Sequence, residues 1–282
     1  MLYFKKIIFD RPGQTCNRFW SYLDTVSWAV LNRKHIAILF WDDSLADYDN
    51  LRKSRFVSFP FYKSFLFRTF GTQRWKRFVE RSLSQPKICQ FFTGKIGRTL
   101  GFIEGWTIRE ADKFFPRVAT EVRPLFNPNL DICSVVEKNM SCLRESSDLV
   151  VGVHIRRGDY AGWKNGAFFY DYPIYARWME QIISLNPDKR VCFYVASNEP
   201  IPQWMFERFN ISHIDGKAAH DLYSLQLCDY LIGPPSTFSK WASIMGHVPY
   251  LIAYDKDMHI ESMDMFSPLK SHTVFENGRV VC

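Results

Sequence analysis

The sequence predicts an α/β protein in which parallel sheets are covered by helices. Short apolar runs typical of buried strands alternate with longer segments in which apolar residues recur at three- and four-residue spacing, as in amphipathic helices. The connections between them are short, which favours parallel strands joined by crossover helices. The chain has 282 residues, enough for two domains with substantial cores. We therefore expect one domain over 1–145 and a second over 146–282.

The first domain is expected to open as a β-α-β unit. Residues 4–9, Phe-Lys-Lys-Ile-Ile-Phe, look like a first strand, 17–33 carry an apolar helical face, and 35–41 return to a strand pattern. This order is the start of a Rossmann-like sheet. The turn over 13–18, Gly-Gln-Thr-Cys-Asn-Arg, would present unpaired backbone N–H groups at the start of the helix. Asn17 could cap that helix, or its side chain could face a ligand.

Positive charge is concentrated in residues 51–123, which hold 16 Lys and Arg against five Asp and Glu. The segment therefore has a net charge of +11. The whole chain has a net charge of +7, so the rest of the chain has a net charge of −4. A concentrated positive field attracts phosphate, lipid headgroups or nucleic acid. Aromatic residues are interleaved with the basic ones, especially over 61–78. Such a segment either lies on an anionic membrane face or is a helical insertion that buries its aromatic side chains.

The second domain shows the more regular alternation, and a helix over 129–144 is expected to lead into it. Strands are predicted at 149–155, 191–196, 211–214, 230–233 and 250–254, and helices at 173–185, 201–209, 220–228 and 237–246. Strands that alternate strictly with helices form a parallel sheet covered on both faces. Such a sheet binds its ligands at the carboxyl ends of the strands.

Residues 154–160, His-Ile-Arg-Arg-Gly-Asp-Tyr, follow the first strand of this second domain. His154 and Arg156 lie on the same side of an extended chain, because side chains alternate along a strand. Arginine offers a planar, permanently charged fork that suits phosphate oxygens. Asp159 could act as a base or could orient the arginines. The alternative is an ion pair among Arg156, Arg157 and Asp159 that simply ends the strand.

A second polar cluster follows later in the same domain. Asp221 opens a predicted helix, and the strand over 230–233 runs into a helix start that carries Ser236, Thr237, Phe238 and Ser239. Three hydroxyls at such a junction either cap the helix or donate hydrogen bonds to an anion at its positive end. Both clusters should meet at one edge of the sheet. They predict a nucleotide-diphosphate site in which an arginine neutralises the leaving group.

The cysteine pattern favours a reducing compartment. The seven cysteines are odd in number and include no Cys-x-x-Cys pair, which argues against a disulfide framework or a zinc site. The N-terminus lacks the long apolar segment of a signal peptide, and no run of 18 apolar residues is present. We expect a cytoplasmic protein, with peripheral contact at the inner membrane face as the option that residues 51–123 raise.

The segment 154–160 resembles the His-x-Arg-Arg-Gly-Asp-Tyr motif of the α-1,2-fucosyltransferase family, which shares a superfamily with α-1,6- and protein O-fucosyltransferases. Residues 221–242 resemble the family's block of Asp, Cys and Ser-x-Phe-Ser, and 13–18 are similar to the superfamily's Gly-x-x-x-Asn motif. Lys240-Trp241 stands where the family usually has Trp-Trp. The chain therefore looks like a divergent member, whose linkage and acceptor the motifs leave open.

The resemblance implies a GT-B glycosyltransferase fold, in which two Rossmann-like domains face a central cleft. It implies a C-terminal domain that binds GDP-fucose, an N-terminal domain on the acceptor side, inversion at the anomeric carbon, and no metal ion or other cofactor. Arg156 would hold the β-phosphate and assist departure of GDP. His154 and Asp221 would contact guanosine. The remaining donor contacts would come from Asn17, Ser236, Thr237, Phe238 and Ser239.

The leading hypothesis is an inverting enzyme that moves fucose from GDP-fucose to a glycan hydroxyl, in the synthesis of a bacterial surface polysaccharide. Asp159 is the candidate general base, and a carboxylate of the N-terminal domain is its rival. The alternatives are a glycosyltransferase that uses another nucleotide sugar and a non-catalytic relative that binds nucleotide or glycan. A nucleic-acid partner is not expected, because the positive segment lies away from the recognisable motifs.

Overall fold

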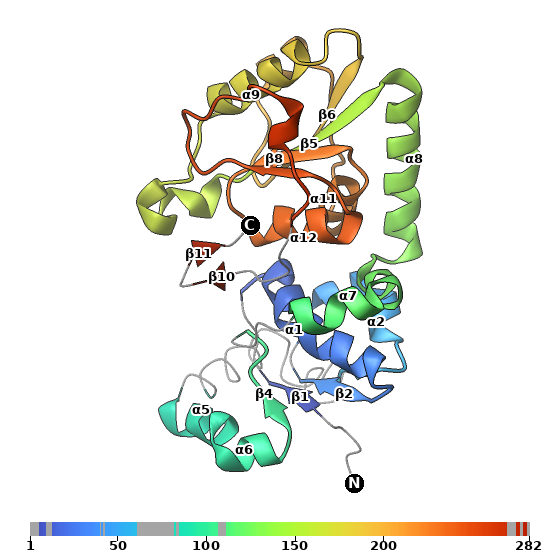
Figure 1. Ribbon diagram of the computed structural model, residues 1–282, viewed down its shortest axis with the longest axis vertical. Coiled ribbons are helices and arrows are strands. Elements are labelled where there is room, and N and C mark those ends of the chain that lie inside the picture. Colours follow the sequence, from blue (N-terminus) through green and yellow to red (C-terminus); the bar gives the residue numbers. More distant parts are fainter. Residues whose placement is uncertain are drawn as a thin grey trace. The chain divides into compact units, whose positions relative to one another are not determined.

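The protein is described by a computed structural model covering residues 6–9, 13–39, 41, 43–60, 82, 85–106, 111–269, 275–276 and 279–280. The aromatic and basic stretch predicted over 61–78 lies outside the described residues. The chain divides into two compact units, Met1–Asn129 and Leu130–Cys282. Each unit contains a parallel sheet, as Figure 1 shows.

The boundary between the units lies before helix α8 (Leu130–Ser146), whereas the sequence placed it after residue 145. The physical reason is packing, because α8 contacts helix α11 (Ala218–Gln226) and strand β5 (Leu149–Ile155) of the second unit. The helix predicted over 129–144 therefore exists, and it belongs to the second unit.

The first unit contains a four-stranded parallel sheet in the order β3-β2-β1-β4. The strands are β1 (Lys6–Ile8), β2 (Ile36–Ile38), β3 (Val57–Ser58) and β4 (Phe102–Ile103). The helices are α1 (Thr15–Leu31), α2 (Asp49–Arg52), α5 (Pro86–Thr93), α6 (Lys95–Thr99) and α7 (Ala111–Val122). The predicted β-α-β opening is confirmed as β1-α1-β2, with α1 packed against α7.

The second unit contains a five-stranded parallel sheet in the order β7-β6-β5-β8-β9. Besides β5, the strands are β6 (Val191–Ser197), β7 (Ile211–Ser212), β8 (Tyr230–Gly233) and β9 (Tyr250–Ile252). Besides α8 and α11, the helices are α9 (Tyr172–Ser184), α10 (Gln203–Arg208) and α12 (Thr237–Gly246). The chain builds β5, β6 and β7 in one direction and then returns to place β8 on the other side of β5.

Strand β5 is buried along its whole length, as its apolar sequence predicted. One face of β5, including Val151 and Val153, joins a core cluster with Trp178 and Met179 of α9. On the opposite face, Gly152 lets α11 approach closely, since a Cβ atom there would lie 2.7 Å from a methyl group of Leu225. The sheet is thus covered by α9 on one face and by α11 and α12 on the other (Figure 1).

Helix α12 begins with a side-chain cap. The hydroxyl oxygen of Ser236 accepts a hydrogen bond from the backbone N–H of Phe238 at 3.2 Å, which satisfies one of the N–H groups that a helix start leaves unpaired. At its other end His247 takes the left-handed conformation with φ 57°. In the part of the chain that the structure describes, no helix combines the length and apolarity needed to cross a bilayer.

Candidate functional site

The candidate site lies beside β5, where the order in which the chain adds strands to the sheet of the second unit reverses. β5 pairs with both β6 and β8, and the chain leaves β5 toward β6 before it returns to form β8. In open parallel sheets, ligands bind outside the carboxyl ends of the strands at such a switch point. The residues that follow β5 and β8 are the 154–160 motif and the 236–239 helix start, so the topology brings the two predicted clusters together.

The imidazole of His154 connects β5 to α12. Its Nδ1 atom lies 2.5 Å from Oγ of Ser239, and its ring centre lies 5.1 Å from that of Phe238. Burial, and secondarily the nearby charge of Arg156, lower the pKa of His154 to about 3. The imidazole is therefore neutral near pH 7, and one of its nitrogens is engaged within the protein. His154 holds the first turn of α12 in place, which sequence reasoning did not foresee.

Arg156 emerges from the end of β5 and forms an ion pair with an exposed carboxylate. Its Nη2 atom lies 2.9 Å from the carboxylate of Asp159, whose side chain is 58% exposed. The guanidinium lies 5.6 Å from the ring centre of Tyr160, and the Tyr160 hydroxyl donates a hydrogen bond of 2.7 Å to the carbonyl of Pro235. Tyr160 thereby places Arg156 beside the loop that precedes α12. An ion pair with so exposed a partner contributes less than about 1 kcal/mol, so a phosphate can replace Asp159.

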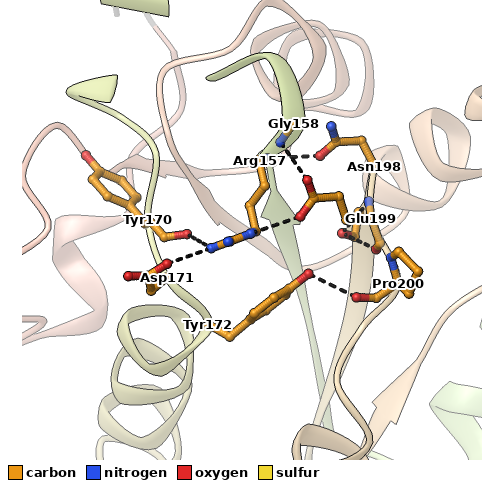
Figure 2. A network of polar contacts seen from close by, with 9 residues as sticks. Arg157, Gly158, Tyr170, Asp171, Tyr172, Asn198, Glu199 and Pro200 are labelled. Carbon is orange, nitrogen blue, oxygen red and sulfur yellow. Dashed lines mark hydrogen bonds and ion pairs between the residues drawn. The ribbon is translucent and has the colours of Figure 1, made fainter. Parts of the chain in front are cut away.

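Arg157, by contrast, is held on several sides, as Figure 2 shows. Its Nε donates to Glu199 at 3.0 Å, and its Nη1 donates to the Tyr170 carbonyl at 2.8 Å and to Asp171 at 3.0 Å. Burial alone would lower the pKa of Arg157, but the hydrogen bonds with Asp171 and Glu199 outweigh it and raise the pKa. The ion pair anticipated among both arginines and Asp159 therefore forms for Arg156 alone.

The loop after β5 is clamped by the residues that follow β6. The backbone N–H of Arg157 donates to Oδ1 of Asn198, and that of Gly158 donates to Oε1 of Glu199, both at 2.9 Å (Figure 2). Gly158 has φ +48°, and a Cβ atom there would lie 2.6 Å from Nδ2 of Asn198. Glycine alone takes this conformation without strain. Sequence reasoning missed Asn198 and Glu199, although their place just after a predicted strand was the available signal.

A cavity of about 740 Å³ opens beside this clamp. It lies at the carboxyl ends of β6 and β7, and its wall includes Asn198, Glu199, Phe206, His213, Asp215 and Asp221. Its volume falls within the range of about 300–1,000 Å³ that is common for small-molecule sites. Because Asn198 and Glu199 both line the cavity and bind the loop after β5, the cavity adjoins the Arg156 loop.

Asp221 is a partly buried acid in the wall of this cavity. The hydroxyl of Tyr194 donates a hydrogen bond of 2.9 Å to its Oδ1 atom. Burial raises the pKa of Asp221 to about 6, although the Tyr194 hydrogen bond acts in the opposite direction. Above pH 6 the side chain is mainly a carboxylate, able to accept hydrogen bonds from N–H groups of a ligand. Asp221, which the sequence predicted to lie beside a ligand, is thus part of the wall of this cavity.

Asn17 belongs to the first unit and is described with that unit alone. Helix α1 begins at Thr15 after the N-cap Gln14, so Asn17 lies within the first turn and is not the cap. Gly13 has φ +40°, and a Cβ atom there would clash with the Asn17 amide. In this turn, a glycine four residues before Asn17 is therefore required because a larger residue would collide with the Asn17 side chain. In the second unit Thr237 opens α12 and is partly exposed, as is Phe238.

No protein-family model matches the sequence, and no curated protein matches it. The structure is similar to that of a mutant of FUT1 from Arabidopsis thaliana in complex with GDP, at 14% identity and a TM-score of 0.55, over 96% of this chain and 74% of that one. It is similar to the fucosyltransferase NodZ from Bradyrhizobium at 14% identity and a TM-score of 0.56, over 91% of this chain and 97% of that one.

A third similar structure is POFUT1 in complex with GDP-fucose, at 9% identity and a TM-score of 0.54, over 85% of this chain and 92% of that one. At these identities the likeness shows a shared fold. The α/β fold expected from the sequence is thereby confirmed, with parallel sheets and the GT-B type of these fucosyltransferase structures.

Proposed function

We propose that the protein is a glycosyltransferase that moves fucose from GDP-fucose to a hydroxyl group of a glycan. The observation that carries the proposal is Arg156, a guanidinium with a replaceable partner at the switch point of a parallel sheet. The fold supports it, because NodZ is described as an α-1,6-fucosyltransferase co-crystallised with GDP and POFUT1 was solved with GDP-fucose. The motif over 154–160 is the third support.

The diphosphate would lie between Arg156 and the first turn of α12. Arginine matches phosphate oxygens with two parallel N–H donors, and a helix start adds unpaired backbone N–H groups and a positive dipole end. The Thr237 hydroxyl is near this start, while Ser236 caps the helix and Ser239 is bonded to His154. We therefore assign Ser236, Ser239 and His154 to shaping the site, and Phe238 to the apolar wall beside it.

The nucleoside would occupy the cavity of about 740 Å³ next to the Arg156 loop. A guanine base offers N–H donors on its pairing edge, and the carboxylate of Asp221 is an acceptor on the cavity wall. This gives Asp221 the role that the motif resemblance implied for it.

In the transfer step, the acceptor oxygen attacks the anomeric carbon of fucose from the face opposite the diphosphate. The new C–O bond forms as the bond to the β-phosphate oxygen breaks, so the configuration inverts. Negative charge develops on the departing GDP, and Arg156 stabilises it there without a metal ion. The hydroxyl proton passes to a carboxylate. Asp159 is the candidate once Arg156 has turned to the diphosphate, and an acidic residue of the first unit is the alternative.

The α-1,2 linkage is the finest part of the proposal and rests on the 154–160 motif alone. The acceptor class we propose is a glycan of a bacterial surface polysaccharide. Neither assignment is needed for donor binding or for slow hydrolysis of the donor, so both can be tested after the donor is known.

The test is a hydrolysis screen with GDP-fucose, GDP-mannose, UDP-sugars and CDP-sugars, each with and without EDTA. We expect the fastest hydrolysis with GDP-fucose and no loss of rate with EDTA. A preference for a UDP-sugar would show a transferase with another donor. Tight nucleotide binding, measured by calorimetry, without hydrolysis or transfer to any glycan would show a non-catalytic relative. Strong inhibition by EDTA would contradict the metal-independent mechanism.

A further inference from the structure

Helices α5 and α6 of the first unit present one face to the protein and another to solvent (Figure 1). The inner face is fixed by Phe92, whose ring centre lies 4.9 Å from that of Phe9, which follows β1, and 4.7 Å from that of Phe102 in β4. Helix α6 is pressed onto the end of α5 at Gly97, where a Cβ atom would collide with the carbonyl of Phe92. The outer face is therefore held in a defined orientation.

The outer face combines apolar and basic side chains. Phe91 is 47% exposed, Ile96 is 64% exposed and Leu100 is 55% exposed. We call this surface the α5–α6 patch and define it by these three residues together with the exposed Lys87, Lys95 and Arg98. On α5, Lys87 and Phe91 are one turn apart and share a face, and Ile96 and Leu100 have the same spacing at α6.

The charge of the α5–α6 patch has one sign. The sequence from Gln85 to Ile103 contains three basic residues and no acidic residue. Among the residues that the structure describes, none forms an ion pair with any of these three basic side chains. Exposed apolar side chains among exposed cations are the arrangement by which a protein lies on an anionic bilayer, with the apolar groups in the headgroup region and the cations on the phosphates.

We propose that the α5–α6 patch docks the protein on the surface of a membrane that contains anionic lipids. A second copy of this chain is a poorer occupant, because a symmetric contact would bring like charges together. Nucleic acid is also poorer, because three large apolar side chains would face a phosphate backbone. This docking is independent of the proposed donor chemistry, and it would bring the enzyme to an acceptor carried on a lipid.

The test is flotation with two kinds of vesicle, phosphatidylcholine alone and phosphatidylcholine with phosphatidylglycerol in equal parts. We expect the wild-type protein to float only with the anionic vesicles and to be released by salt. A triple variant with Phe91→Ser, Ile96→Ser and Leu100→Ser should lose binding. A second triple variant with Lys87→Gln, Lys95→Gln and Arg98→Gln should bind on the order of 100-fold more weakly.

Matched controls lie on the second unit. Leu130→Ser with Val135→Ser removes exposed apolar side chains, and Lys138→Gln, Lys189→Gln and Lys256→Gln remove the same charge as the basic variant. Both controls should bind like the wild type. Equal binding to both kinds of vesicle, no binding at all, or equal losses in patch and control variants would each overturn the proposal. Donor hydrolysis without vesicles should be unchanged in every folded variant, which separates this test from that of the proposed function.

Discussion

The Nδ1 atom of His154 lies 2.5 Å from Oγ of Ser239, and this one hydrogen bond joins the end of β5 to the first turn of α12. Both side chains are buried, with exposed fractions of 5% and 1%. Strands β5 and β8, which lead into the two parts of the candidate site, are paired through their backbones. The position of the helix start relative to Arg156 depends on this bond and on Tyr160.

Ser239→Ala should therefore reduce the free energy of unfolding by about 1–3 kcal/mol, because it leaves a buried imidazole nitrogen without its partner. Urea unfolding measures the change. Ser146→Ala is the matched control, since the Ser146 hydroxyl is exposed and bonds only to carbonyls of its own helix. The control should change stability by less than about 0.5 kcal/mol. Equal effects of the two substitutions would contradict the role given to His154 and Ser239.

Asp221 and His154 should make opposite contributions to the pH dependence of stability. The folded pKa of Asp221 is raised to about 6, so its contribution to stability declines as the pH rises from about 4 through 6. The folded pKa of His154 is lowered to about 3, so its contribution is lost as the pH falls from about 6.5 toward 3. Urea titrations of the wild type and of Asp221→Asn at pH 4 and pH 7 separate the two, because the variant keeps only the contribution of His154.

Asp221→Asn should raise the free energy of unfolding at pH 7 by up to about 3 kcal/mol, because it removes a carboxylate whose charged form burial disfavours. The same substitution should weaken binding of GDP, measured by calorimetry at pH 7.5. Loss of both stability and binding would mean that the Asp221 carboxylate is structural. In the wild type, GDP affinity should increase between pH 5 and pH 7 as Asp221 ionises.

Arg156→Ala should lower the rate of donor hydrolysis or transfer by about 10²- to 10³-fold, the cost of removing one key donor to a developing charge. Stability should change by about 1 kcal/mol, since Asp159, the ion-pair partner that is lost, is 58% exposed. Arg190→Ala provides the control, because Arg190 also forms an exposed ion pair, with Asp148. Near-normal turnover of the Arg156 variant would exclude it from the catalytic site.

Gly158→Ala should destabilise the protein by about 1–3 kcal/mol, because alanine is strained at φ +48° and its Cβ would meet Asn198. The Arg156 loop should shift as well, so donor hydrolysis should fall. Gly162→Ala is the contrasting substitution four residues later. Gly162 has φ −98° and an open space where a Cβ would lie, so alanine should be neutral or slightly stabilising. Thermal melting of both variants measures the difference, and Gly158→Ala should melt at a lower temperature than Gly162→Ala.

The fold of the second unit could be predicted because its signals are local. The apolar run over 149–155 is β5, and the predictions at 230–233 and 237–246 match β8 and α12 residue for residue. Helix α11 begins two residues earlier than predicted, at Ala218, because its N-cap Lys217 is not one of the residue types that mark a helix start in a sequence. The unit boundary could not be predicted, because the partner of α8 is set by tertiary packing.

The sequence placed the residues of the two clusters at strand ends, but it could not predict the contacts that their side chains make. Arg156 and Arg157 are adjacent and chemically identical, and no periodic pattern says that one is engaged by Glu199 and Asp171 while the other keeps an exposed partner. These contacts join segments that lie far apart in the sequence. The same holds for His154, which alternation places beside Arg156 but whose hydrogen bond to Ser239 only the packed helix reveals.

The central place of β5 also has a consequence for biosynthesis. Both neighbours of β5 follow it in the chain, so Arg156 leaves the ribosome before β6 and well before α12. A nascent chain that ends before Thr237 has the clamp around Arg157 but no helix start for a diphosphate and no partner for His154. Under the proposed function, nucleotide would stabilise only a chain that contains both parts of the site. Under the proposed function, the donor would therefore not assist the early folding of this unit and would bind only after α12 has been synthesised and packed.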